Sequence, residues 1–393
     1  MGLHFRFMVI ATKQETMKIY IISPTYPSEG HPVNTFIKQI VDEWADQGHE
    51  CVVVAPFSVT KSHWKSPDKE IQTTVKGNSV TIYRPHYISV SNLKLFGVSI
   101  STWLRNKAFN RVLKKLPPDA DVMYGHFWHN AVGGYEYAKN HHIPFFVACG
   151  ESTISEEWTE ARNKPFVDYV TGIVCVSTKN KDALIDMGMA TADKCVVLPN
   201  AYNPDKFCKL DRAECRQRLN LPEKAFIVAF VGTLCHRKGT KRVAEAIKQI
   251  EGEPVYSFFI GGEGGETPDC DNILYKGLVQ HEDLKYYLNA ADCFVLPTLA
   301  EGCSNAVIEA LGCGMAIISS DLPFNHDVLN RDNAILLEPD DVDAISRAIT
   351  ALRDDRTLRD RLAANALASS RHLTTSSRAG AIIEFMKSKI HKS

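Results

Sequence analysis

The chain has 393 residues, with 45 basic and 46 acidic side chains, so its formal net charge is −1 and no overall field favours nucleic acid as a partner. At about 100–200 residues per domain, this length predicts two or three domains. The 11 cysteines include no C-x-x-C pair, and no apolar run reaches the roughly 20 residues that span a bilayer. We therefore expect reduced thiols and a cytoplasmic location, without a disulfide framework or a zinc cluster.

The first 16 residues do not match the pattern that follows, and Arg6 stands where an N-myristoylation signal needs Ser or Thr. We expect residues 1–16 to be a disordered extension. From Met17 onward, apolar runs such as KIYIIS and ECVVVAP alternate with amphipathic stretches, the first of which stops at Gly48. This alternation predicts a parallel sheet flanked by helices, in a first domain over residues 17–205.

A basic amphipathic stretch lies inside this first domain. In TWLRNKAFNRVLKKL, apolar side chains recur at helical spacing between lysines and arginines: Leu104, Ala108, Val112 and Leu116. A helix of this kind over residues 102–116 can bind anionic lipid, here at the inner face of the membrane. An ordinary helix that covers the sheet has the same pattern, so both interpretations stay open.

A second series of apolar runs starts at FIVAFVG and continues through YSFFIGG, NILYKG, CFVLPT and MAIISSD. It predicts a second Rossmann-like domain over residues 206–375, after a linker rich in Pro and Asn near residues 199–225. We expect a C-terminal helix, at about 376–393, to pack back on the first domain. Ligands of doubly wound sheets bind at the carboxyl ends of the strands, so function is expected where the two domains face one another across a cleft.

The stretch FVGTLCHRKGTK places basic residues between a strand and a helix of the second domain. Gly232 ends the strand, and Arg237 and Lys238 lie just before the helix. Cations beside the free N–H groups of a helix start form an anion site, which suits phosphate. Taken alone, an ordinary surface loop explains this segment equally well.

The stretch CFVLPTLAEGCSNAVIEALGCG places two glutamates around a small polar turn. Glu301 lies in the loop after a strand and Glu309 about one turn into the next helix. The residues between them offer backbone N–H donors at the helix start: Gly302, Cys303, Ser304 and Asn305. Carboxylates accept hydrogen bonds from vicinal hydroxyls, and N–H groups bind oxyanions, which together suit a sugar joined to a ribose through a diphosphate. Stabilisation of the helix N-terminus is the alternative explanation for one such glutamate.

From Phe226 to about Pro339, the chain resembles the donor-binding domain of retaining GT-B glycosyltransferases of family 4, the glycosyl transferases group 1. The resemblance rests on ILYKGLVQHEDLKYYLNAADCFVLPT and on the Glu-x7-Glu block EGCSNAVIE; GHECVVVAP, DVMYGHFW and PNAYNPDKF extend it to the first domain. It implies an α/β, GT-B fold of two Rossmann-like doubly wound parallel-sheet domains facing a cleft, with the acceptor side first and the donor side second. It also implies retaining, metal-independent transfer from a UDP- or GDP-sugar to a hydroxyl of a glycan or lipid-linked glycan, without a cofactor.

The resemblance further implies roles for individual residues of the second domain. Glu309 would bind the ribose hydroxyls, Glu301 the hydroxyls of the donor sugar, and Lys238 the diphosphate. The backbone of residues 302–305 would hold the sugar and the phosphate. Such fixed donors stabilise charge on a leaving diphosphate without reorganising.

The chain departs from the family pattern at two places. Thr233 follows Gly232 where the family usually has arginine, so Arg237 is the candidate for the second cation of the diphosphate. Cys149 stands where many members have a histidine near the donor sugar. The role of that histidine is therefore unfilled or is performed by another group.

The acceptor side of the cleft is predicted to contain four residues of the first domain: Glu151, His126, Gly30 and Thr35. Glu151 follows the Cys149-Gly150 pair, and His126 follows a strand end in GHFWHNA. A buried, hydrogen-bonded histidine is the alternative interpretation of His126. The loop YPSEGHPVNTF contains the other two. Asn34 and Thr35 lie near the place where a glycine of the family commonly lets the acceptor or phosphate approach, so Gly30 is displaced from that role.

Other classes of function are not excluded at this point. The Asp-x-Asp pairs at 119–121 and 269–271 are interpreted as solvated turn residues, so no metal site is expected. A non-catalytic scaffold on the same fold fits the missing His and Arg, although Glu301, Lys238 and Glu309 argue against it. A nucleotide-sugar epimerase would need an acid/base pair, for which Glu151, His126 and Glu301 are the visible candidates.

Overall fold

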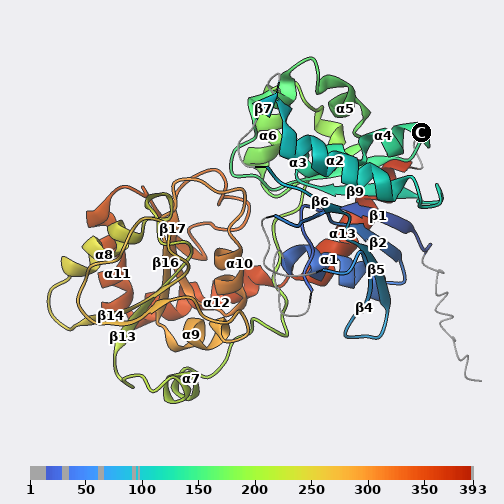
Figure 1. The fold of residues 1–393 in the computed structure, drawn as a ribbon. Helices are drawn as coiled ribbons and strands as arrows, with labels where there is room; N and C mark the ends of the chain where they lie inside the picture. The colour runs from blue at the N-terminus through green and yellow to red at the C-terminus, as the bar shows by residue number, and fades with distance from the viewer. Residues whose placement is uncertain (1–14, 29–34, 61–65, 91–93, 96–97, 391–393) are drawn as a thin grey trace, which may run out of the picture.

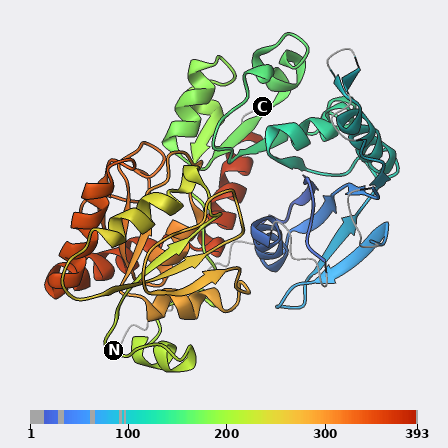
Figure 2. The same ribbon diagram turned by 60° about the vertical axis from the view of Figure 1, so that its left-hand side comes forward.

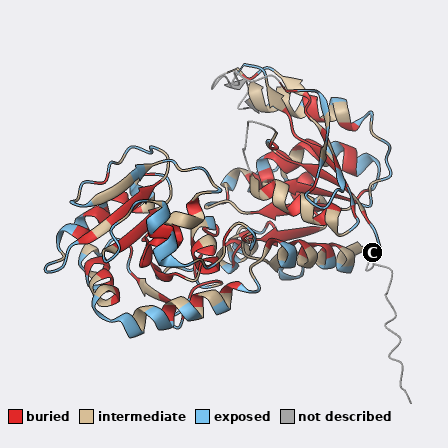
Figure 3. Ribbon diagram, turned by 90° about the horizontal axis from the view of Figure 1, so that it is seen from below, coloured by how far each residue is buried: buried red, intermediate tan, exposed pale blue. Residues whose placement is uncertain are grey.

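The computed structural model describes residues 15–28, 35–60, 66–90, 94–95 and 98–390. The chain forms two parallel sheets, each with helices on both faces (Figure 1). The central strands of both sheets are buried, and the polar faces of the helices are turned outward (Figure 3). Residues 1–14, most of the expected N-terminal extension, lie outside the described residues.

The N-terminal sheet has eight strands, which are parallel except for β4 at one edge. In spatial order they are β12 (Cys195–Val197), β11 (Gly172–Cys175), β10 (Phe145–Cys149), β9 (Val122–His126), β1 (Lys18–Ile22), β2 (Glu50–Val54), β5 (Ser79–Tyr83) and β4 (Lys69–Thr73). Two short pairs lie outside the sheet: β3 (Phe57–Ser58) with β6 (His86–Tyr87), and β7 (Lys94–Leu95) with β8 (Val98–Ser99). The central strands are runs of Val, Ile and aromatic residues because both of their faces are covered.

Helices cover the two faces of this sheet through separate cores. One face carries α1 (Thr35–Asp46) and α13 (Thr375–Ile390). The other carries α2 (Ile100–Leu113), α3 (Trp128–Ala131), α4 (Tyr135–Asn140), α5 (Lys164–Tyr169) and α6 (Thr178–Asp186). The carboxyl ends of β1 and β9, where the strand order reverses, therefore open toward the loops before α1 and α3.

The helix expected at 102–116 begins and ends earlier than its sequence pattern suggests. Ser99 caps α2 by accepting a hydrogen bond from the Thr102 backbone N–H at 3.4 Å, and prolines follow Leu116, which lies beyond the helix. The buried side chains of α2 are Ala108, Phe109 and Leu113. The predicted apolar stripe therefore coincides only partly with the buried face of α2.

The C-terminal sheet has six strands, all of them parallel, in the order β15 (Ile273–Gly277), β14 (Val255–Ile260), β13 (Phe226–Val231), β16 (Cys293–Leu296), β17 (Ala316–Ser320) and β18 (Ala334–Leu337). Its helices are α7 (Arg212–Arg218), α8 (Thr240–Lys248), α9 (Leu284–Ala290), α10 (Asn305–Gly312), α11 (Val342–Asp354) and α12 (Arg356–Ser370). This strand order is that of a Rossmann fold, with its switch point between β13 and β16. The stretch expected to be a linker contains the helix α7. Asp211 caps this helix by accepting a hydrogen bond from the Glu214 N–H at 3.0 Å.

The last helix belongs to the N-terminal layer. In Figures 1 and 2, α13 leaves the C-terminal domain and lies beside α1. Trp44 Nε1 of α1 donates to the carbonyl oxygen of Ala379 at 3.0 Å, and Ala379 and Ile383 are buried against the sheet. The chain therefore crosses between the domains twice. The domain limits at 205/206 and 375/376 stay predictions.

Candidate active site

Two predicted segments of the C-terminal domain meet at the carboxyl edge of its sheet. Gly232 follows β13, and the loop 297–304 follows β16, which is the neighbouring strand at the switch point. The structure thereby brings Arg237 and Glu301 together, although they are 64 residues apart in the chain. This edge is where doubly wound sheets bind their ligands.

Glu301 lies between the two predicted cations. Its Oε1 is 2.7 Å from Arg237 Nη1 and 2.5 Å from Lys238 Nζ, and it accepts a hydrogen bond from Thr298 Oγ1 at 3.2 Å. The Lys238 and Glu301 side chains are only 12% and 13% exposed, whereas Arg237 is 44% exposed. Such a partly buried, bifurcated ion pair holds all three side chains in one geometry.

The turn before α8 places these cations. Residues His236–Lys238 form a short 3-10 turn, and Gly239 ends it with a φ of 86°, a left-handed conformation that favours glycine. A Cβ at this glycine would also lie 2.8 Å from Pro297 Cγ, so only glycine lets the turn approach the β16 loop. The Leu299 N–H then donates to the Arg237 carbonyl oxygen at 2.8 Å.

Thr233 contributes no charge at the position where the resemblance implies arginine. Its neighbours Gly232 and Leu234 donate backbone hydrogen bonds of 2.9 Å to Ile260 and Gly262. The glycines at 261–265 allow this approach, because a Cβ at Gly264 would lie 2.5 Å from Thr233 Cγ2. The glycine-rich run is therefore explained by packing of the loop after β14 on the loop after β13.

Glu309 points from α10 toward a histidine that the sequence did not identify. His281 Nε2 is 3.3 Å from Glu309 Oε1, and the glutamate side chain is 14% exposed. Burial raises the pKa of Glu309, while the hydrogen bond from His281 opposes that shift. His281 follows β15 and packs edge-on against Phe207, with ring centroids 5.1 Å apart. The sequence signal that could have identified His281 was its position shortly after a strand, at the edge of the sheet where ligands bind.

The turn between the glutamates contacts the N-terminal domain. A Cβ on Gly302 would lie 2.5 Å from the Gly150 carbonyl oxygen, so glycine is required for this approach. Asn200 Nδ2 donates to the Cys303 carbonyl oxygen at 2.9 Å and to Asn305 Oδ1 at 2.8 Å. Ser304 is the N-cap of α10, yet its buried Oγ has no partner among the described residues.

Glu151 faces this contact from the other domain. Its Oε1 accepts a hydrogen bond from the Trp128 N–H at 3.0 Å, whereas its buried Oε2 has no partner in the described part of the chain. Burial raises the pKa of this carboxyl group, against several backbone hydrogen bonds. Cys149, at the place of the family histidine, is fully buried and lies 3.7 Å from Asn180 Nδ2. It cannot touch a ligand in this conformation.

His126 is buried at the end of β9, with an exposure of 3%. Burial lowers the pKa of its imidazole to about 3, so the ring is neutral at ordinary pH. Its Nε2 has no described partner, and its ring lies edge-on to Tyr124 at 5.1 Å. Thr35 is the first residue of α1, whereas Gly30 lies outside the described residues.

Lys179 joins the two halves of the site and was not predicted. From α6, its Nζ donates to the Ser152 carbonyl oxygen at 2.6 Å and to the Glu301 carbonyl oxygen at 3.3 Å. The adjacent Thr178 donates from its N–H and its Oγ1 to Asp327, at 2.7 and 2.6 Å. The bonds of Lys179 hold the Glu301 loop against the 150–152 loop, and those of Thr178 hold α6 against the segment between β17 and β18.

The Asp-x-Asp pairs have protein partners. Asp119 pairs with Lys18 at 2.9 Å and accepts from the Tyr20 hydroxyl at 3.1 Å, and Asp269 pairs with Lys248 at 2.6 Å. These contacts agree with a role in turns. Independence from metal ions stays a prediction.

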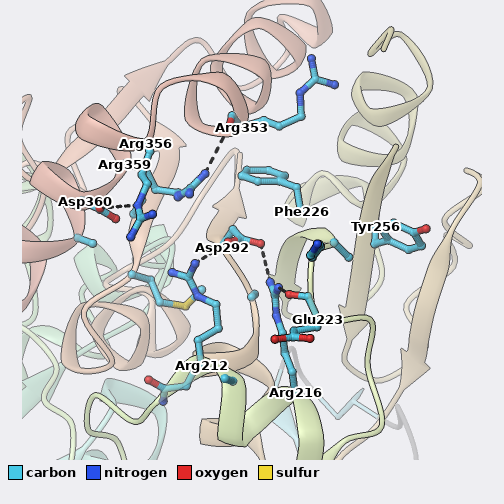
Figure 4. Close-up of a pocket in the computed structure, with 18 of the residues that line it drawn as sticks. Arg212, Arg216, Glu223, Phe226, Tyr256, Asp292, Arg353, Arg356, Arg359 and Asp360 are labelled. Atoms are coloured by element: carbon cyan, nitrogen blue, oxygen red, sulfur yellow. Dashed lines mark hydrogen bonds and ion pairs between the residues drawn. The ribbon is translucent and has the colours of Figure 1, made fainter. Parts of the chain in front are cut away.

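A cavity of about 1140 Å³ lies at the opposite edge of the C-terminal sheet (Figure 4). Its arginines bind the carbonyl groups of helix and loop ends or pair with acids. Arg216 bonds the Ala290 carbonyl oxygen at 2.9 Å and Asp292 at 2.7 Å, and Arg353 bonds the Glu253 carbonyl oxygen at 2.8 Å. These side chains satisfy carbonyl groups at the end of α9 and in the loop before β14, which is a structural role. The predicted site residues are all elsewhere.

Two family models match consecutive parts of the chain. The model described as Glycosyltransferase Family 4 matches residues 33–206, and the one described as Glycosyl transferases group 1 matches residues 211–368. TuaC of Bacillus subtilis, provisionally named a glycosyltransferase of teichuronic acid biosynthesis, is 25% identical over 85% of this chain and 88% of its own. An Escherichia coli UDP-Gal:alpha-D-GlcNAc-diphosphoundecaprenol alpha-1,3-galactosyltransferase is 29% identical over 48% of this chain and 52% of its own.

Solved structures share the whole fold. Sucrose-phosphate synthase of Thermosynechococcus elongatus superposes with a TM-score of 0.75 at 17% identity, covering 96% of this chain and 100% of that one. Anabaena HepE, in complex with UDP and glucose, has a TM-score of 0.72 at 16% identity over 95% of this chain and 100% of its own. In the described residues, no helix is both long and apolar enough to cross a membrane. The two family models, with the GT-B architecture of these structures, show that the chain belongs to glycosyltransferase family 4.

Proposed function

We propose that the protein is a retaining, metal-independent glycosyltransferase that moves a sugar from a UDP- or GDP-sugar to a hydroxyl of a glycan or lipid-linked glycan. The observation that carries this proposal is the pairing of Glu301 with Lys238 and Arg237 beside the start of α10. These are the groups that a sugar diphosphate needs, and they come from one domain.

In this proposal the bound donor replaces Glu301 as the partner of the two cations. The diphosphate pairs with Lys238 and Arg237 and accepts from the first N–H groups of α10. Glu301 is thereby free to accept from hydroxyls of the donor sugar. Glu309, beside His281, accepts from the ribose hydroxyls.

The reaction follows from these positions. The bond between the anomeric carbon and the diphosphate oxygen breaks, and negative charge develops on the leaving oxygen. The fixed cations and N–H groups stabilise that charge. The acceptor hydroxyl attacks the anomeric carbon from the face that the diphosphate leaves, and its proton passes to the leaving phosphate oxygen. No side chain has to act as a nucleophile.

The names of similar proteins support the substrate classes. HepE was crystallised with UDP and glucose, and the Escherichia coli relative is named for a UDP-galactose donor. That relative and one from Campylobacter jejuni are named for acceptors linked to diphosphoundecaprenol. A lipid-linked acceptor would place the protein at the cytoplasmic face of the membrane.

The exposed face of α2 supports contact with an anionic membrane. Trp103 is 48% exposed, with Lys107 Nζ 3.7 Å from its ring centroid, and Arg111 and Lys114 are exposed on the following turns. Cations beside an exposed tryptophan suit an interface with lipid headgroups. Co-sedimentation with anionic and neutral liposomes tests this contact. Equal, negligible binding to both would contradict it, as would unchanged binding after Trp103→Ser with Lys107→Ser.

The donor assignment is tested by calorimetric titration with UDP, GDP and other nucleoside diphosphates, with and without EDTA. We expect one nucleotide to bind equally well in both buffers. Glu309→Ala should weaken that binding at least about 10-fold, because two charged hydrogen bonds are lost. Glu245→Ala, an exposed glutamate of α8, is the matched control. A folded protein that binds no nucleoside diphosphate would contradict the proposal.

A further inference from the structure

Arg378 is a half-buried cation that has no acidic partner in the described part of the chain. It lies in the first turn of α13, and its Nε donates to the carbonyl oxygens of Pro199 at 2.7 Å and Leu198 at 3.4 Å. No Asp or Glu among the described residues lies within ion-pair distance of it. Burial lowers the pKa of its guanidinium group, so the surrounding protein disfavours its charge.

The place of this charge in its helix is unfavourable. The N-terminus of a helix carries a partial positive charge, which repels a cation in the first turn. An arginine does not lose its proton in proteins, so the charge cannot be removed by titration. An anion bound beside this half-buried charge would therefore be favourable.

Other groups that favour anions lie around Arg378. The first turns of α1, α10 and α13 contain no acidic residue. Arg378 donates a hydrogen bond to the carbonyl oxygen of Pro199. The next residue, Asn200, binds the turn at the start of α10. Arg378 interacts electrostatically with Cys303 of that turn and with His126 at the end of β9. The arginine therefore lies between the two domains, behind the turn that follows Glu301.

Buried polar atoms without partners mark the same place. Ser304 is 4% exposed and His126 is 3% exposed, and neither Ser304 Oγ nor His126 Nε2 has a partner within the described ranges. The hydroxyl of Tyr124, which also interacts with Arg378, is buried and unpartnered as well. Buried polar atoms are nearly always satisfied, so several orphans beside one cation indicate a ligand.

The arginines of the cavity in Figure 4 provide a contrast. Arg216 is 7% exposed, but Asp292 compensates its charge at 2.7 Å, and its other nitrogens bind carbonyl oxygens. Arg378 likewise binds two carbonyl groups, yet no acid faces it in the described structure. Arg216 is therefore fully paired within the protein, whereas the charge of the half-buried Arg378 is available to an anion.

We propose that Arg378 binds the outer, sugar-bearing phosphate of the donor and so supplies, from the opposite domain, positive charge that Thr233 does not. This inference rests on the proposed nucleoside-diphosphate donor. The outer phosphate is assigned because Cys303 adjoins Gly302, the point where the Glu301 turn meets the N-terminal domain. Since α13 belongs to the N-terminal layer, the contact would couple diphosphate binding to the approach of the two domains.

The test compares nucleoside diphosphate and monophosphate binding by calorimetry, using whichever of UDP/UMP or GDP/GMP the protein prefers. For Arg378→Gln we expect about 10-fold to 100-fold weaker diphosphate binding, the loss of one charged hydrogen bond, with monophosphate affinity changed less than about 2-fold. Arg378→Lys should fall between this variant and the parent. Arg371→Gln, an exposed arginine in the turn before α13, is the control.

A structural role alone would not change the ratio of the two affinities. If Arg378→Gln and Arg378→Lys, folded by circular dichroism, leave that ratio at the parent value, the inference is wrong. A raised KM for the acceptor with unchanged diphosphate binding would also overturn it, because the anion would then belong to the acceptor. If the unaltered protein binds no nucleoside diphosphate, the proposed function itself fails, which is a distinguishable result.

Discussion

The two sides of the cleft satisfy their polar groups differently. On the donor side, Lys238 and Arg237 pair with Glu301, and Glu309 meets His281. On the acceptor side, His126 Nε2 and Glu151 Oε2 are buried without a partner among the described residues. The charged side chains of the donor side are paired within a single domain, whereas buried polar atoms of the acceptor side have no described partner.

This difference indicates how the binding of the donor and of the acceptor is divided between the two sides of the cleft. A buried polar group without a partner costs roughly 1–3 kcal/mol, so a fold retains one mainly where a ligand completes it. Paired charges on the donor side hold a geometry that is ready for a diphosphate. The orphaned groups on the acceptor side would be completed by the acceptor and by the approach of the donor.

The largest expected effect comes from breaking the donor side. Lys238→Ala removes a cation from the diphosphate site and leaves Glu301 with Arg237 alone. We expect kcat/KM to fall about 10²-fold to 10³-fold, the range for loss of one group that stabilises developing charge. Steady-state assay of nucleotide release, once an acceptor is known, measures it. Lys241→Ala, an exposed lysine of α8, is the control, and an equal loss in both variants would contradict the assignment.

The donor side was also the more predictable from sequence. Its strands are continuous apolar runs, and Glu301 and Glu309 lie in one short segment whose helical spacing limits where they can point. The regular alternation of strands and helices then indicated that the site lies at the carboxyl edge of the sheet. Local pattern was sufficient because each residue and its element are neighbours in the chain.

Partners brought from distant segments could not be predicted in this way. Lys179 reaches the Glu301 carbonyl oxygen across 122 residues of sequence, and Arg378 reaches Pro199 across 179. Neither belongs to a short motif, and both lie in helices whose sequences suggest ordinary packing. Their positions depend on how two domains and a returning helix meet, which periodicity does not encode.

A smaller effect is expected from disturbing the contact between the two sides. Gly302→Ala would place a Cβ about 2.5 Å from the Gly150 carbonyl oxygen, so the domains must shift apart. We expect kcat/KM to fall about 10-fold to 100-fold, as misplacement of reacting groups by about 1 Å does. Nucleoside monophosphate affinity should change little, because the ribose and the inner phosphate are bound within one domain.

This result would separate donor binding from alignment of the acceptor. Gly380→Ala is the control, since nothing lies within 4 Å of a Cβ there. If Gly302→Ala weakened nucleoside monophosphate binding as strongly as it lowered kcat/KM, the binding of the ribose and the inner phosphate would not be complete within one domain.

The smallest expected effect is on stability and concerns Glu151. Burial raises the pKa of its carboxyl group, so the folded protein holds this proton more tightly than the unfolded chain does. The favourable contribution is therefore fully present below the unfolded pKa of about 4.3 and is lost as the pH rises through the raised folded pKa. Above that range the folded state carries a poorly solvated carboxylate.

Glu151→Gln keeps an oxygen that can accept from the Trp128 N–H but has no charge to desolvate. At pH 8 it should exceed the parent in free energy of unfolding by roughly 1–3 kcal/mol, the cost of one unsatisfied buried group, and the advantage should shrink toward pH 4.5. Urea denaturation at several pH values measures this difference, with the exposed Glu136→Gln of α4 as the control. A difference that does not change with pH would mean that the charge of Glu151 is already compensated. The acceptor side would then be as complete as the donor side, and its orphaned atoms would have to be explained without a ligand.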